Sequence, residues 1–176
     1  GVEVAGHVSQ ANDGLPSASL YLLLYGVLVL GTFGVVTLVA RRGDGATDLS
    51  AFRGLARERP VLALALTVFL LAQAGVPLTS GFIAKFGVIK AAVDVESYAI
   101  ALIAMVAAVI AAYLYLRIMI SMWLADPDAA DAEREPVRVP PAARLGIVAV
   151  VAFTLVVGVF PGWLVDASER VLELAS

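Results

Sequence analysis

Hydrophobic residues in this chain are gathered into long runs, and polar residues separate the runs. Four of these runs contain no charged residue: Leu20–Ala40, Pro60–Ala84, Tyr98–Leu116 and Leu145–Val165. About 20 apolar residues in a helix cross the roughly 30 Å hydrocarbon core of a bilayer. Backbone amides inside lipid need hydrogen-bond partners within the protein, so such runs form helices. The alternation of apolar and polar residues that is typical of barrel strands is missing. The pattern predicts an all-α integral membrane fold with four transmembrane helices.

The composition agrees with this fold and excludes several other classes. Of the 176 residues, 61% are hydrophobic and 15% charged, whereas soluble domains average about 45–50% and about 25%. A soluble fold would lack polar side chains to cover its surface. The chain has no cysteine and one histidine, His7, which excludes disulfides and metal sites built from thiolates or several histidines. With a net charge of −3 and no basic stripe, we expect no nucleic acid partner.

Positive charges are distributed unevenly over the connections between the runs. Nine of the twelve Lys and Arg residues lie in 41–59 and 117–144, and the other three are Lys85, Lys90 and Arg170. By the positive-inside rule, both Arg-bearing loops face the cytoplasm and both ends lie outside. The expected order is external loop 1–19, helix 20–40, cytoplasmic loop 41–59, broken helix 60–95, helix 98–124, cytoplasmic loop 125–144, helix 145–165 and external tail 166–176.

The second run is too long and too interrupted to be one straight helix. Read continuously from Pro60 to Val93, it would measure about 51 Å at 1.5 Å per residue, far more than the hydrocarbon thickness. Its middle combines residues that interrupt helices with hydroxyls that can satisfy freed backbone groups, namely Gly75, Pro77, Thr79, Ser80 and Gly81. We expect two half-helices joined by an extended stretch at membrane depth, an arrangement that transporters use for ion paths.

Lys85 directly follows this break and lies between apolar neighbours. One interpretation is snorkelling, in which the helix leaves the membrane nearby and the ammonium reaches the interface. Lys90 fits that description better, because Asp94 and Glu96 follow it. The other interpretation places Lys85 inside the bundle on a water-filled path, where a lysine can load and unload protons. The residues alone leave both interpretations open.

Other residues in the runs have simpler expected roles. Gln73, one turn before the break, is the only side-chain amide in the runs. It either holds water or, as we favour, hydrogen-bonds a neighbouring helix. Gly26, Gly31 and Gly34 indicate close helix packing.

The segment around the break resembles a known family. Residues 72–86 read AQAGVPLTSGFIAKF. They are similar to the pattern SLAGIPPTxGFxGKF of subunit N of bacterial NADH–quinone oxidoreductase, the subunit-2 counterpart of mitochondrial complex I. Supporting matches at Tyr25, 30–36, 52–55 and 113–117 follow the family order. Leu78 stands where the pattern has its second proline, and the wider antiporter-like superfamily shares the motif loosely.

The resemblance implies that the chain is the C-terminal part of a fourteen-helix subunit with two inverted five-helix units, each containing a broken helix. A start at Gly1 rather than Met also leads us to expect a segment of a longer polypeptide. Lys85 would be the proton carrier at the outer end of a polar axis, supported by Gln73 and the residues of the break. The rest of that axis would lie in a missing N-terminal part.

The resemblance also implies the setting and the function. NADH, flavin, iron–sulfur clusters and quinone would belong to other subunits, and no cofactor or metal is expected in this chain. The implied partners are other membrane subunits, the missing N-terminal part and the lipid of a bacterial inner membrane. The expected function is a non-redox, proton-translocating subunit of NADH–quinone oxidoreductase. The alternatives are a subunit of a multisubunit cation/proton antiporter, or a structural membrane element without an ion path, in which Lys85 faces lipid or headgroups.

Overall fold

The computed structural model describes residues 2–40, 49–126 and 139–164, with side chains in the first helix described from Ser17 onward. These ranges contain helices and no strands: α1 (Val2–Ala40), the 3-10 helix η1 (Leu49–Phe52), α2 (Leu55–Glu58), α3 (Pro60–Ala74), α4 (Ser80–Asp94), α5 (Tyr98–Leu124) and α6 (Pro141–Val159). The predicted all-α fold is confirmed. The His7 side chain and the expected tail at 166–176 lie outside the described residues.

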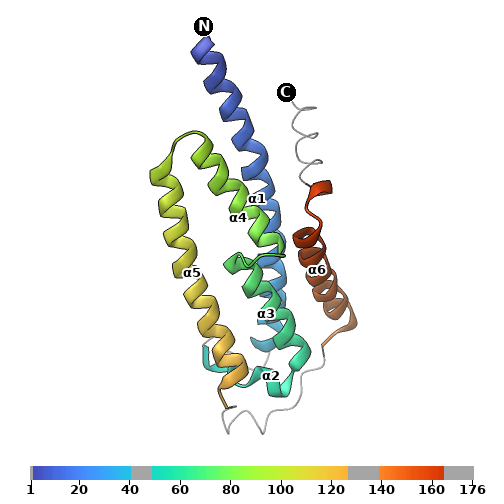
Figure 1. The fold of residues 1–176 in the computed structure, drawn as a ribbon. Helices are drawn as coiled ribbons and strands as arrows, with labels where there is room; N and C mark the ends of the chain where they lie inside the picture. Colours follow the sequence, from blue (N-terminus) through green and yellow to red (C-terminus); the bar gives the residue numbers. More distant parts are fainter. Residues whose placement is uncertain (1, 41–48, 127–138, 165–176) are drawn as a thin grey trace.

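The long helices run up and down a single bundle (Figure 1). α1 runs to the end of the bundle that carries η1 and α2. From that end α3 and then α4 run back, and α5 runs toward it again. α6, the last helix, runs away from it. α1 packs against α3, α4 and α6, whereas α5 packs against α3 and α4. The junction of α3 and α4 therefore lies about halfway along the bundle, beside α1.

Three described helices are long and apolar enough to cross a bilayer, at Ser17–Val39, Tyr98–Leu124 and Pro141–Val159. The remaining expected crossing is divided between α3 and α4, which have 15 residues each. Each is about 22 Å long at 1.5 Å per residue, which is too short to cross roughly 30 Å alone. Helix length thus supports three continuous spans. A fourth crossing would need α3 and α4 together, as the two halves of one broken helix.

Two expected boundaries are wrong. The region before Leu20, expected as a loop, is helical from Val2, because each residue added to an existing helix gains a hydrogen bond, apart from Pro16, which has no N–H. The last helix, expected at 145–165, begins at Pro141 and ends at Val159. Proline is tolerated in the first helical turn, and Pro161 disfavours helical geometry in the residue before it.

The main hydrophobic core lies between the break and the end that carries α2. It joins residues of α1, η1, α2, α3, α5 and α6, among them the fully buried Leu28, Leu66, Phe69 and Met122. A smaller cluster of Leu24, Ala84 and Val157 lies on the other side of the break. The break is thus held between two packed regions.

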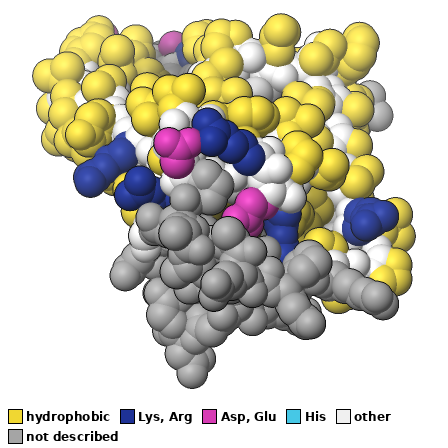
Figure 2. Space-filling view, turned by 90° about the horizontal axis from the view of Figure 1, so that it is seen from below, with side chains coloured by type: hydrophobic (Ala, Val, Ile, Leu, Met, Phe, Trp, Pro, Cys, Tyr) yellow, Lys and Arg dark blue, Asp and Glu magenta, His cyan; other side chains and the backbone are white. Residues whose placement is uncertain are grey.

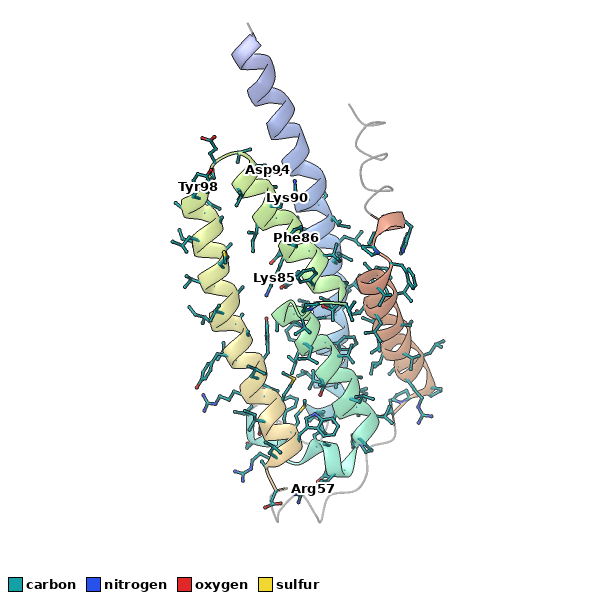
Figure 3. The ribbon with its side chains drawn as sticks, viewed as in Figure 1. Arg57, Lys85, Phe86, Lys90, Asp94 and Tyr98 are labelled. Atoms are coloured by element: carbon teal, nitrogen blue, oxygen red, sulfur yellow. The ribbon has the colours of Figure 1, made fainter. Side chains whose placement is uncertain are left out.

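Arginine side chains gather at the end of the bundle that carries α2. Figure 2 views this end and shows blue Lys and Arg side chains beside the yellow apolar surface. Arg57 of α2 pairs with Asp126 at 2.5 Å, which ties α2 to the end of α5. Lys85 lies about halfway along the bundle, and Lys90 lies toward the other end (Figure 3). The fold therefore brings the two Arg-bearing connections to one end; which side of the membrane that end faces stays a prediction.

Candidate functional site

The broken helix has a well-defined end at Gly75. This residue caps α3 with a left-handed backbone (φ +86°), and its amide donates to the carbonyls of Leu71 (3.1 Å) and Ala72 (2.9 Å). Glycine is the residue that adopts this conformation without steric cost. The chain then leaves helical geometry until Ser80 begins α4. The predicted break is present, over residues 75–79.

Lys85 lies at this break. Its Nζ donates to the Ala74 carbonyl oxygen at 3.1 Å, and its side chain is half-buried. Figure 3 shows it at the junction of α3 and α4, well away from both ends of the bundle. The C-terminus of α3 carries the negative end of the helix dipole, so it favours the ammonium. This placement fits the site interpretation of Lys85 better than snorkelling.

Lys90 has a different environment, five residues further along α4. Its Nζ donates to Asp94 at 2.6 Å, and both side chains are exposed. It lies nearer the connection to α5 than Lys85 does (Figure 3). This i,i+4 pair on an exposed surface agrees with the interfacial role expected for Lys90.

Gln73 connects the end of α3 to α1. Its side-chain Nε2 donates to Thr32 Oγ1 at 2.5 Å, which is the interhelical bond favoured from the sequence. Its backbone carbonyl accepts a hydrogen bond from the Tyr25 hydroxyl at 2.9 Å. Tyr25 is a residue of the site that sequence reasoning did not assign, although it stands one turn after Tyr21, on which its ring stacks.

The other residues predicted for the break have distinct places. Thr79 donates through Oγ1 to the Val76 carbonyl at 2.6 Å, as expected for a hydroxyl that satisfies freed backbone. The Ser80 hydroxyl is buried, and no hydrogen-bond partner is recorded for it among the described residues. Gly81 is essential for packing, since a Cβ there would overlap the Ala72 carbonyl. Pro77 is exposed within the break.

The arrangement holds the Lys85 amine at a backbone carbonyl. Within the described ranges Lys85 forms no ion pair, and its Nζ donates to a backbone carbonyl. Those same ranges contain no group of three His, Cys, Asp or Glu side chains that could hold a metal ion.

Comparisons with known proteins agree on one family. Residues 1–111 match the family described as "NADH:quinone oxidoreductase/Mrp antiporter, TM". NADH-quinone oxidoreductase subunit N 1 of Herpetosiphon aurantiacus is 36% identical over 172 residues, which are 98% of this chain and 35% of that protein. Subunit N 3 of Streptomyces griseus is 39% identical over 171 residues, 97% of this chain and 30% of that protein. The chain spans about a third of the length of these curated relatives.

Solved structures show the same arrangement of helices. A chain of respiratory complex I from Thermus thermophilus is matched with a TM-score of 0.69 and 28% identity, over 86% of this chain and 34% of that one. A chain of the Mrp complex from a Dietzia species is matched with a TM-score of 0.74 and 23% identity, over 89% and 37%. The second likeness shows the fold alone.

These matches confirm the resemblance to subunit N stated from the break motif. They also agree with the apolar spans, which make this a multi-pass membrane protein. The family match covers α1, α3, α4 and the first half of α5, and so includes the break and Lys85. The chain belongs to the membrane protein family shared by NADH:quinone oxidoreductases and Mrp antiporters.

Proposed function

We propose that this chain is part of a proton-translocating, non-redox membrane subunit of a bacterial NADH–quinone oxidoreductase, with Lys85 as a proton carrier. The observation that supports this most is the position of Lys85 Nζ, 3.1 Å from the Ala74 carbonyl at a helix break halfway along the bundle. Relatives named subunit N across nearly the whole chain support the choice of complex.

The chemistry follows from the ammonium and its single recorded acceptor. A lysine amine remains a hydrogen-bond donor in both its protonated and its neutral form, so Ala74 can hold Nζ through a cycle of proton loss and gain. A carbonyl dipole stabilises the cation less than a carboxylate would. The break also provides backbone polar groups that can order water near the amine.

Electron transfer is assigned to other parts of the complex in this proposal. NADH, flavin, iron–sulfur clusters and quinone would be bound by other subunits, and this chain would respond to quinone reduction through contacts with neighbouring membrane subunits. The membrane would be the bacterial inner membrane.

The test is a set of three substitutions in the complex in native membranes. Lys85→Ala should leave assembly and NADH oxidation by an artificial acceptor near native, and should lower proton pumping several-fold. Lys85→Arg should also impair pumping, because a guanidinium does not release its proton in proteins. Lys90→Ala serves as the matched control and should pump normally, because its exposed pair with Asp94 contributes little.

The other interpretations predict different levels of proton pumping for the three variants. If Lys85 only snorkels, Lys85→Arg would restore pumping fully. If the chain is a structural element, Lys85→Ala would pump normally, and this result would overturn the proposal. The antiporter alternative has the support of the shared family. It predicts proton movement that depends on sodium and continues without quinone reduction.

A further inference from the structure

α3 ends at Ala74, so its last three carbonyls, at residues 72–74, do not receive the amide donor four residues later that a continuous helix would supply. Leu71 accepts hydrogen bonds from the amides of Gly75 and Val76, and Ala72 accepts from Gly75. The last two carbonyls accept from side chains of other helices. Gln73 accepts from the Tyr25 hydroxyl of α1, and Ala74 accepts from Lys85 of α4.

Pro77 explains why the Gln73 carbonyl depends on a side chain. In a continuous helix this carbonyl would accept from the amide four residues later, and that residue is Pro77, which has no N–H. The Ala74 carbonyl would accept from Leu78, but the chain has left helical geometry there, with φ +68° at Leu78. Two adjacent carbonyls at membrane depth therefore need donors from elsewhere.

Tyr25 is held in place to supply one of these donors. Its ring stacks on Tyr21 with centroids 4.4 Å apart, which restricts the direction of the hydroxyl. Two turns further along α1, Thr32 accepts the side-chain amide of Gln73. α1 therefore holds Gln73 by both its side chain and its carbonyl, next to the carbonyl that Lys85 uses.

We propose that Tyr25 is a positioning residue for Lys85. Its hydroxyl holds the Gln73 carbonyl and with it the end of α3, so the neighbouring Ala74 carbonyl stays where it accepts from Nζ. Without the hydroxyl, the end of α3 loses this bond to α1, and the ammonium, which has three donors, is held less firmly at Ala74. Gln73 is buried, and a buried carbonyl without a donor also draws in water. The positioning of Lys85 by Tyr25 matters for proton transfer only if Lys85 is the proton carrier, and in this respect the inference rests on the proposed function.

The experiment measures the position of Lys85 directly, in the assembled complex in native membranes. Acetic anhydride is added at low dose, and the acetylation of Lys85 relative to the exposed Lys90 of the same chain is read by mass spectrometry. Tyr25→Phe keeps the stacked ring and removes only the hydroxyl. We expect it to raise the Lys85:Lys90 acetylation ratio several-fold, because the amine becomes mobile and better hydrated.

Thr32→Val is the matched control. It removes the other bond between α1 and Gln73 but leaves both terminal carbonyls of α3 with their donors. It should lower the amount of complex without changing the acetylation ratio. Tyr25→His retains a ring that can donate a hydrogen bond, and it should give a Lys85:Lys90 acetylation ratio nearer to native. It also tests the same position should the phenylalanine variant fail to assemble. An unchanged ratio in Tyr25→Phe, or an equal change in Tyr25→Phe and Thr32→Val, would overturn the inference.

The result separates this inference from the proposed function. Proton pumping by Lys85→Ala tests whether Lys85 carries protons, and the acetylation ratio tests whether Tyr25 fixes its position. Impaired pumping in Lys85→Ala with an unchanged ratio in Tyr25→Phe would overturn the positioning role alone. Normal pumping in Lys85→Ala with a raised ratio in Tyr25→Phe would overturn the proposed function and leave Tyr25 as the residue that orders the break.

Discussion

A lysine at membrane depth is costly unless polar groups solvate its ammonium. For Lys85 the solvating group is the Ala74 carbonyl, which has no amide donor because α3 ends at that residue. The end of α3 also presents the negative end of its dipole to the ammonium. The break therefore leaves a carbonyl that needs a hydrogen-bond donor, and the dipole at the same helix end stabilises a donor that is positively charged.

Gly75 controls how closely Lys85 approaches this carbonyl. Gly75→Ala places an L-residue at φ +86° and a Cβ 3.0 Å from Lys85 Cδ. The left-handed conformation alone costs about 1–2 kcal/mol for an alanine. We expect a lower Tm of the detergent-solubilised complex together with reduced proton pumping.

Gly75→Asn separates the two causes. Asparagine tolerates left-handed geometry but also carries a Cβ against the Lys85 stem. It should recover part of the lost thermal stability without recovering pumping. If asparagine restores pumping as well, backbone strain and not contact with Lys85 is the cause.

Single residues also show where sequence reasoning stops. Gly26, Gly31 and Gly34 look alike in the sequence, and close packing was expected at all three. A Cβ at Gly31 would meet Phe69 and Val150 at 2.8 Å, whereas at Gly26 and Gly34 it would meet no atom of the described residues within 4 Å. The expectation is confirmed for Gly31 and has no support among the described residues for the other two, because the face that a helix buries depends on neighbours that an all-apolar run does not specify. Tyr25 was missed for the same reason.

At the scale of elements, the broken helix could be predicted because its signals are local. Length, Pro77 and the flanking glycines are enough to require an interruption. The element that covers the break is not a local property. Gly158 of α6 packs directly on the backbone of Leu78 and Thr79, and nothing in the spacing of the last run indicates that contact.

The contact between α6 and the break can be tested with two glycines of the same helix. A Cβ at Gly158 would overlap the Leu78 carbonyl and the Thr79 Cα, and backbone atoms cannot move aside as a flexible side chain can. Overpacking of this kind costs about 1–3 kcal/mol. Gly158→Ala should therefore lower the Tm and the amount of assembled subunit.

Gly146→Ala on the same helix is the control. No atom of the described part of the chain lies within 4 Å of a Cβ there, and alanine is favoured over glycine in a helix by about 1 kcal/mol. This variant should be as stable as the native chain or slightly more so. Equal effects of the two substitutions would show that α6 does not pack on the break.

At the scale of the whole molecule, the number and length of the uncharged runs predict the fold class, but they do not predict how the helices are arranged. Long uncharged runs specify helices that cross a bilayer, whatever their neighbours are. Which helices touch is decided by small differences in shape along faces that are all apolar. The close pairing of α1 with the broken helix and the sparse packing of α5 could not be predicted for that reason.

The orientation of the whole molecule is the property that charge, and not packing, decides. The described arginines gather at the end that carries η1 and α2, while the α4–α5 connection lies at the other end (Figure 1). With nine of twelve Lys and Arg residues in the two Arg-bearing connections, that end should face the cytoplasm. The chain itself has no cysteine, so single cysteines can report the side directly.

Ser50 in η1 and Val95 beyond α4 are exposed and lie at opposite ends, so each serves as the control for the other. In a subunit without other reactive cysteines, a membrane-impermeant maleimide added to spheroplasts should label Val95→Cys and spare Ser50→Cys. Inverted vesicles should give the opposite result, because they expose the cytoplasmic face. Labelling of Ser50→Cys in spheroplasts would reverse the orientation, and Lys85 would then lie on the cytoplasmic side of the main hydrophobic core.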